Sequence, residues 1–299
     1  MAPPTRLLYR ARDGTIRLSP PRVGSSFEVT PYAILSHTWQ SDEDEVVLQD
    51  IGRSKAREKA GYAKIRFCVD QATKDGIPYS WVDSCCIEKA SSAELQEAIT
   101  AMFSWYRNAQ KCYVYLSDVS WTEKDAAGQS LPPYAWEPAF RRSRWFTRGW
   151  TLQELLAPSS LEFYSAECVR LGDKQSLESI IHAITRIPVQ ALRGADMSTF
   201  DMFERLSWAA NRNTKRREDR AYSMLGICNV FMPLIYGEGD NAWDRLLRAI
   251  EKNLKKNAER IREMVSFLLL IHKVSTRQGR QLTSCSSNHL VVLCEGFAC

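Results

Sequence analysis

The chain has 299 residues, 44% of them apolar, so it is long enough to form one large domain with a sizeable core. A formal net charge of +5 is too small to argue for nucleic acid as a partner, and no apolar run approaches the length of a membrane span. Nine cysteines without a C-x-x-C pair, in a chain without a secretory apolar stretch at its start, predict reduced thiols in a cytoplasmic protein and no metal site.

The first stretch of the chain is rich in proline and arginine. Its four prolines would break any amphipathic helix, so we expect residues 1–30 to be a loosely structured lead-in.

From Tyr32 onward, short apolar runs alternate with helical patterns. Buried strands are predicted at 32–36, 79–82, 112–116 and 161–164. The helices between and after them are expected at 61–74, from the capping box Ser91-Ser92-Ala93-Glu94 onward, around Trp150 and Glu154, and at 177–185. Such alternation is typical of a parallel, doubly wound sheet, so the predicted fold class is α/β.

After about residue 195 the pattern becomes helical only. Helices are predicted at 199–210, 217–228 and 239–257, which suggests an α/β core at 31–195, a helical subdomain at 196–257 and an atypical tail at 258–299. The tail contains one strand-like run, 290–293. Ten lysines and arginines against three acids between 245 and 280 give the last helix a basic side. A solvated face is the usual explanation for such a side, and binding to a partner or to nucleic acid is the weaker alternative.

The run from Arg144 to Pro158 combines tryptophans, arginines and one carboxylate. On a helix, Trp150 and Glu154 share a face, whereas Leu152 points the opposite way. A helix that buries Leu152 would therefore hold Glu154 towards a rim or cleft. The rival interpretations make Glu154 a surface partner of Arg148 or a cap on the core.

Other polar residues follow two of the predicted strands. Ser36, His37 and Trp39 come at the end of the first strand, and Asp83 follows the second. Ligands of doubly wound sheets bind beyond the carboxyl ends of the strands, so these residues are expected to line the same cleft as Glu154. A structural role remains the alternative for His37, and Asp83 either binds a ligand hydroxyl or accepts backbone N–H groups.

Several further carboxylates have simpler interpretations. Glu97 lies on the exposed side of its predicted helix. The acids of Glu218-Asp219-Arg220 complement a helix dipole, with a salt link from Arg220 to the sheet domain as the alternative. Gly237-Glu238-Gly239 is typical of a tight turn, with anion binding at the N-terminus of the following helix as the alternative.

Five segments, in order, resemble the fungal heterokaryon-incompatibility (HET) domain over roughly residues 31–255. They are Tyr32-Ala33-Ile34-Leu35-Ser36-His37-Thr38-Trp39, Trp81-Val82-Asp83-Ser84-Cys85-Cys86-Ile87, Arg148-Gly149-Trp150-Thr151-Leu152-Gln153-Glu154-Leu155, Glu218-Asp219-Arg220-Ala221-Tyr222-Ser223-Met224-Leu225-Gly226 and Pro233-Leu234-Ile235-Tyr236-Gly237-Glu238-Gly239. The departures are Gln40, where the family usually has glycine, and Glu88, where it often has aspartate. The tail does not resemble a NACHT or repeat module. The resemblance implies non-self recognition and programmed cell death in a filamentous fungus.

HET domains are also similar to TIR domains, which are flavodoxin-like and in several cases hydrolyse NAD with a glutamate. The matching segment here is Trp150-Thr151-Leu152-Gln153-Glu154. The resemblance implies that Glu154 is catalytic and that NAD is a substrate rather than a tightly bound cofactor. It also implies that the protein self-associates on activation and interacts with an incompatibility partner protein. The expected ligand-binding residues are Ser36, His37, Trp39, Asp83, Arg148 and Trp150. The alternative is a non-enzymatic module that signals by assembly.

Overall fold

The computed structural model describes residues 3–21, 30–122, 124, 129, 132 and 134–284. The chain divides into two compact units, Met1–Leu247 and Arg248–Cys299. The first unit contains the sheet and most of the helices, and the second contains most of one long helix.

A seven-stranded sheet with the order β2-β1-β4-β3-β5-β6-β7 forms the centre of the first unit. Its four middle strands are parallel: β4 (Tyr79–Trp81), β3 (Tyr32–His37), β5 (Lys111–Tyr115) and β6 (Leu161–Tyr164). Numbered along the chain from β3, these strands have the order 2-1-3-4 of doubly wound, flavodoxin-like sheets. The predicted α/β class and the four predicted strands are confirmed.

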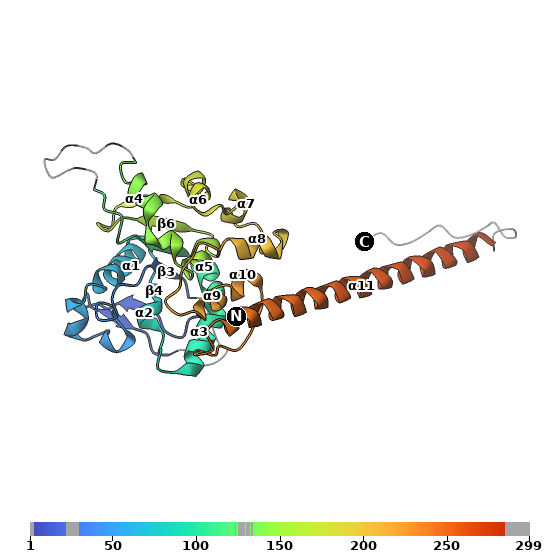
Figure 1. The fold of residues 1–299 in the computed structure, drawn as a ribbon, viewed down its shortest axis with the longest axis horizontal. Helices are drawn as coiled ribbons and strands as arrows, with labels where there is room; N and C mark the ends of the chain where they lie inside the picture. Colours follow the sequence, from blue (N-terminus) through green and yellow to red (C-terminus); the bar gives the residue numbers. More distant parts are fainter. Residues whose placement is uncertain are drawn as a thin grey trace, which may run out of the picture. The chain divides into compact units, whose positions relative to one another are not determined.

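Helices cover both faces of this sheet (Figure 1). On one face, Phe67 of α1 (Tyr62–Lys74) packs against Tyr113 and Tyr164 of the middle strands. On the other, Trp81 of β4 contacts Trp105 of α3 (Ser92–Asn108). α5 (Thr151–Leu156) contacts both α3 and β3. Strand side chains alternate between faces, so each apolar run of the sequence supplies two layers of core.

The lead-in differs from the prediction. Residues Leu8–Arg10 (β1) and Ile16–Leu18 (β2) form an antiparallel hairpin, and Leu8 pairs with Ser80 of β4. Leu7 and Leu8 are completely buried, which explains why this segment is ordered despite its prolines. Gly14 lies in the turn of the hairpin with φ +76°, and Arg17 is exposed. Residues of these types are common in loops, which is why the sequence of the hairpin resembles that of a loop. At the opposite edge, β7 (Arg170–Asp173) pairs antiparallel with β6 and was not predicted.

The remaining helices of the first unit are short. They are α2 (Asp83–Cys86), α4 (Glu137–Arg142), α6 (Glu178–Thr185), α7 (Val189–Leu192), α8 (Met202–Ser207), α9 (Asp219–Tyr222) and α10 (Leu225–Cys228), with 3-10 turns at Leu48–Asp50 (η1), Ser54–Glu58 (η2), Arg144–Thr147 (η3) and Met197–Thr199 (η4). The helix predicted at 177–185 is observed as α6, whereas the predicted stretch 199–210 is shortened to α8 and the stretch 217–228 is divided into α9 and α10.

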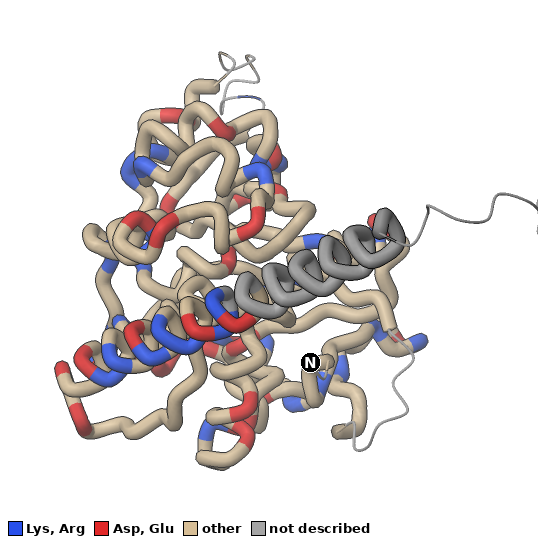
Figure 2. Tube along the Cα trace, turned by 90° about the vertical axis from the view of Figure 1, so that its right-hand side faces the viewer, with Lys and Arg blue, Asp and Glu red and all other residues tan. Residues whose placement is uncertain are grey.

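The last helix, α11 (Asn241–Ser284), continues well past the predicted end at residue 257. Part of the segment expected to be an atypical tail is therefore helical, and the strand-like run 290–293 lies outside the described residues. Figure 2 shows basic and acidic residues following one another along the described turns of α11. Among the described helices, none has an apolar stretch that would cross a bilayer.

Gly226 of α10 marks a close approach between α10 and α3. A Cβ atom added at Gly226 would lie 2.2 Å from Cβ of Phe103, and both atoms are fixed to helix backbones. Gly226→Ala should therefore push the two helices apart and cost about 1–3 kcal/mol of the free energy of unfolding. Urea unfolding measures this loss as a lower midpoint, and an unchanged midpoint would contradict the packing of α10 on α3.

Candidate functional site

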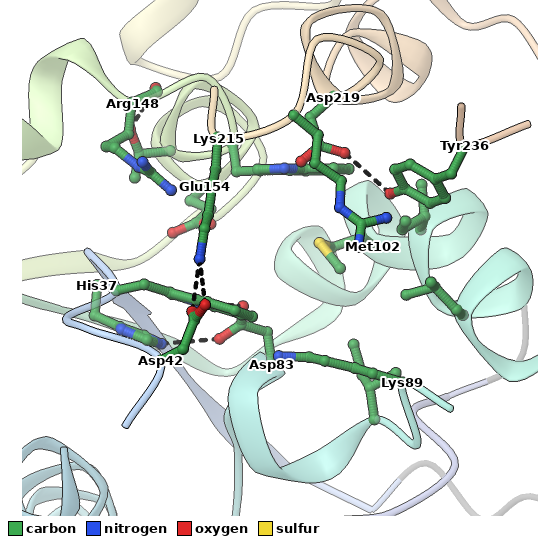
Figure 3. Close-up of a pocket in the computed structure, with 17 residues that line it drawn as sticks. His37, Asp42, Asp83, Lys89, Met102, Arg148, Glu154, Lys215, Asp219 and Tyr236 are labelled. Atoms are coloured by element: carbon green, nitrogen blue, oxygen red, sulfur yellow. Dashed lines mark hydrogen bonds and ion pairs between the residues drawn. The ribbon is translucent and has the colours of Figure 1, made fainter. Parts of the chain in front are cut away.

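A pocket of about 580 Å³ opens beyond the carboxyl ends of the parallel strands (Figure 3). Six of the seven residues expected at the site line it: His37, Trp39, Asp83, Arg148, Trp150 and Glu154. His37 ends β3, Asp83 begins the turn after β4, and Glu154 projects from α5. The doubly wound topology thus gathers three segments that are far apart in the sequence.

Glu154 is almost completely buried, with 7% of its surface exposed. Burial raises its pKa to about 8, against the smaller lowering effect of the Ser36 hydrogen bond. The carboxyl group is therefore mostly protonated at neutral pH. All six residues of α5 are buried, so this helix is a core helix and not the half-exposed helix that the Leu152 pattern indicated.

Ser36 lies behind Glu154 and not on the wall of the pocket. It is completely buried, its hydroxyl donates to Oε2 of Glu154 at 2.5 Å, and it accepts a hydrogen bond from Nε1 of Trp145 at 2.8 Å. Ser36 therefore positions the carboxyl group rather than contacting a ligand from this place. Trp145, which sequence analysis did not assign to the site, fixes the direction of the serine hydroxyl.

Trp145→Phe tests this buried chain of hydrogen bonds. The substitution keeps most of the ring packing against Phe163 but removes the donor to Ser36, so we expect a loss of about 1–2 kcal/mol in the free energy of unfolding. Trp208→Phe is the matched control, because Trp208 is also buried and packs against one aromatic neighbour. Urea unfolding of both variants measures the difference, and equal losses would show that the hydrogen bond contributes nothing.

His37, Asp83 and Trp39 form one hydrogen-bonded group. Nε2 of His37 lies 2.8 Å from Oδ1 of Asp83, and Nε1 of Trp39 donates to Oδ2 at 2.9 Å. Burial alone would raise the pKa of Asp83, but the charge and hydrogen bond of His37 and the charge of Lys89 together lower it below its usual range. Asp83 is thus an ionised carboxylate whose hydrogen-bond partners are the side chains of His37 and Trp39. One of its two expected roles was to accept hydrogen bonds from backbone N–H groups instead.

Cationic side chains surround the mouth of the pocket. Lys89 places its Nζ 3.5 Å from the centre of the Trp39 ring, and Lys215 pairs with Asp42 at 2.6 Å. Neither Arg148 nor Arg216 forms an ion pair with any residue that the structure describes. Arg216 stacks over the ring of Tyr236, with 4.5 Å between Cζ and the ring centre, which leaves the edge of its guanidinium group for an anion. Pyrophosphate is the kind of group that arginine binds well.

The helical half of the unit closes the pocket with residues that sequence analysis did not place at the site. Tyr236 donates to Oδ1 of Asp219 at 3.0 Å, and both side chains line the pocket. Burial raises the pKa of Asp219, while hydrogen bonds from Trp150 and Tyr236 partly oppose it. The sequence contained a signal for both residues, because each lies in a segment that resembles the HET family. Asp219 was not assigned to the site because the helix dipole already explained an acidic residue at that position.

Glu218 supports this wall of the pocket from behind. Its Oε1 accepts hydrogen bonds from the backbone N–H groups of Gly237 and Gly239, at 2.8 and 3.0 Å. Both glycines have positive φ angles, so the segment is the tight turn that the sequence predicted. In the described part of the chain, no three histidine, cysteine or acidic side chains converge as metal ligands.

Comparisons with known proteins agree with these motifs. Residues 32–135 match the family described as Heterokaryon incompatibility protein (HET). The chain is 53% identical over 249 residues to the Vegetative incompatibility protein HET-E-1 of Podospora anserina. That alignment covers 83% of this chain but 18% of the relative, so the chain spans less than a fifth of the relative's length. No solved structure matches the chain significantly.

Proposed function

We propose that this chain, which carries a HET domain, acts in vegetative incompatibility and non-self recognition, and that it triggers cell death by hydrolysing NAD. The observation that carries the enzymatic part is the floor of the pocket. There a buried carboxyl group with a pKa raised to about 8 lies below aromatic side chains and two arginines without ion-pair partners. The volume of about 580 Å³ is within the range of pockets that bind small molecules and cofactors.

The chemistry requires one carboxylate close to the ribose. When the bond between nicotinamide and ribose breaks, the electron pair leaves with nicotinamide and the ribose becomes oxocarbenium-like, as in glycoside hydrolysis. Water then adds to the anomeric carbon and loses a proton, which yields ADP-ribose. In this proposal ionised Glu154 stabilises the cationic ribose, and Arg148 binds the pyrophosphate. Trp39 or Trp150 stacks on a base.

The raised pKa suits a cationic substrate. The nicotinamide ring of NAD carries a positive charge, and a nearby positive charge lowers the pKa of a carboxyl group. Binding of NAD therefore favours the ionised form of Glu154 at the moment when the reaction needs it. Without a nearby positive charge of this kind, burial keeps the same group neutral.

The same proposal places the protein in the cytoplasm, where NAD is abundant. We further propose that it self-associates on activation and that an incompatibility partner provides the signal.

A non-enzymatic assembly module is the second candidate function. It is favoured by large apolar side chains exposed in the helical half of the first unit: Phe203 is 86% exposed, Phe231 62% and Ile235 50%. Exposed apolar groups of this size mark interaction surfaces when they form a continuous patch.

The order of events in cells separates the two candidates. The chain is expressed from an inducible promoter in fungal hyphae, and cellular NAD and viability are followed together. NAD should fall before viability does if the protein hydrolyses NAD. Cells that die while their NAD is still at its starting level would favour assembly without catalysis. As a control, Phe203→Ser with Phe231→Ser should slow killing under the assembly hypothesis.

A further inference from the structure

Arg212, which follows α8 in the chain, is a buried cation that contacts the first residue of α5. Only 8% of its surface is exposed, and burial lowers its pKa to about 9. Its Nη1 donates to the carbonyl of Arg148 at 2.8 Å and to Oγ1 of Thr151 at 3.0 Å. No carboxylate of the described residues lies within ion-pair distance, and its buried Nη2 has no hydrogen-bond partner there. A buried guanidinium group in this state is costly, so its retention needs a physical reason.

The position of Arg212 provides that reason. Thr151, which holds the guanidinium group, precedes Glu154 by three residues on α5, and residues at this spacing share one face of a helix. Arg212 thus lies about one helical turn from the carboxyl group, inside the same dry region, where charges interact strongly. Glu154 in turn favours the charged form of Arg212.

We propose that Arg212 is a positioning residue that supplies the resident counter-charge for ionised Glu154. While Glu154 is protonated, Arg212 carries the only charge of the two. When Glu154 loses its proton, the two side chains become a neutral buried pair. The catalytic purpose of this role rests on the proposed function. The electrostatic coupling between Arg212 and Glu154 itself does not depend on it.

Other titratable and hydrogen-bonding groups also affect the pKa of Glu154, and the variants compared must leave them unchanged. Ser36 of β3 donates a hydrogen bond that lowers its pKa, Tyr106 of α3 also lowers it, and ionised Asp83 raises it. Arg148, which precedes α5, lowers it, and the Cys112 thiol of β5 interacts with it. From the helical half of the unit, Arg212 reaches Thr151 of α5 and Asp219 reaches Trp150 just before it.

The test follows the proton on Glu154 directly. Above pH 6.5 an ordinary carboxyl group is ionised, so the infrared band of a protonated carboxyl group, absent from Glu154→Gln, reports this residue. Arg212→Gln removes the charge but retains a donor for Thr151, and Arg205→Gln is the matched control. Arg205 is equally buried, has one hydrogen bond to the carbonyl of Ile227 and leaves one nitrogen without a partner.

In Arg212→Gln the band should titrate at a higher pH than in the natural protein, because a nearby positive charge has been removed. Arg212→Lys should restore the original titration, and Arg205→Gln should not change it. An unchanged titration in Arg212→Gln would overturn the proposal, as would an equal shift in Arg205→Gln. If Arg212→Gln does not fold, Arg212→Met replaces the buried cation with an apolar side chain of similar length, and an unchanged titration in that variant is equally contradictory.

Activity measurements separate this inference from the proposed function. Where nicotinamide release is observed, its pH profile should move upward in Arg212→Gln by the same amount as the infrared titration. If the titration shifts but no variant cleaves NAD, the proposed hydrolysis fails while the pairing of Arg212 with Glu154 stands.

Discussion

Replacing Glu154 with glutamine should reduce nicotinamide release from NAD by at least about 100-fold, the usual effect of removing one preorganised electrostatic group from an active site. Glutamine has nearly the same shape and can still interact with Ser36, but it cannot carry the negative charge that the oxocarbenium-like ribose requires. Initial rates at saturating NAD, measured by separation of nicotinamide from NAD, give the comparison.

Glu97→Gln is the matched control for this substitution. Glu97 lies on α3 with its side chain exposed to solvent, as its helical position predicted, and it does not line the pocket. The control variant should release nicotinamide at the rate of the natural protein. Retention of more than about a tenth of the natural rate by Glu154→Gln would remove Glu154 from the mechanism.

The stability of the natural protein should fall with rising pH relative to that of Glu154→Gln. Below pH 4.5 Glu154 is protonated in both the folded and the unfolded state. Between 4.5 and about 8 the unfolded state releases this proton and the folded state retains it, so the contribution of Glu154 to stability decreases as the pH rises. The decrease ends above about pH 8, where the folded protein also ionises.

The interval between 4.5 and about 8 corresponds to about 5 kcal/mol, at about 1.4 kcal/mol for each pKa unit. We therefore expect the difference in unfolding free energy between the two proteins to change by about 3–5 kcal/mol from pH 5 to pH 9, in favour of Glu154→Gln at high pH. Urea unfolding at each pH measures it, and shifts that are common to both proteins cancel. A difference that is constant across this range would mean that Glu154 ionises normally.

The sheet could be predicted because its strands carry local signals. Apolar runs such as Tyr32–His37 and Lys111–Tyr115 are buried on both faces, and this leaves a continuous apolar pattern in the sequence. The hairpin strands β1 and β2 were missed for the opposite reason. They are three residues each and expose arginines, so they are ordered only by the pairing of β2 with β1 and of β1 with β4.

The candidate site could be predicted only in part. His37 and Asp83 follow strand ends, and topology brings such residues together. No periodicity shows that α9 and the turn at Gly237 close the same pocket, because that contact depends on how the helical half packs. The roles of Ser36 and Arg212 depend on burial and on individual hydrogen bonds, which a linear sequence does not display.

The most direct test of the account measures NAD hydrolysis by the purified protein over a wide range of protein concentrations. Nicotinamide and ADP-ribose should appear in equal amounts, at a rate for each protein molecule that rises with concentration as the protein self-associates. Folded protein that releases no nicotinamide at any concentration would contradict the enzymatic account and leave the assembly hypothesis ahead.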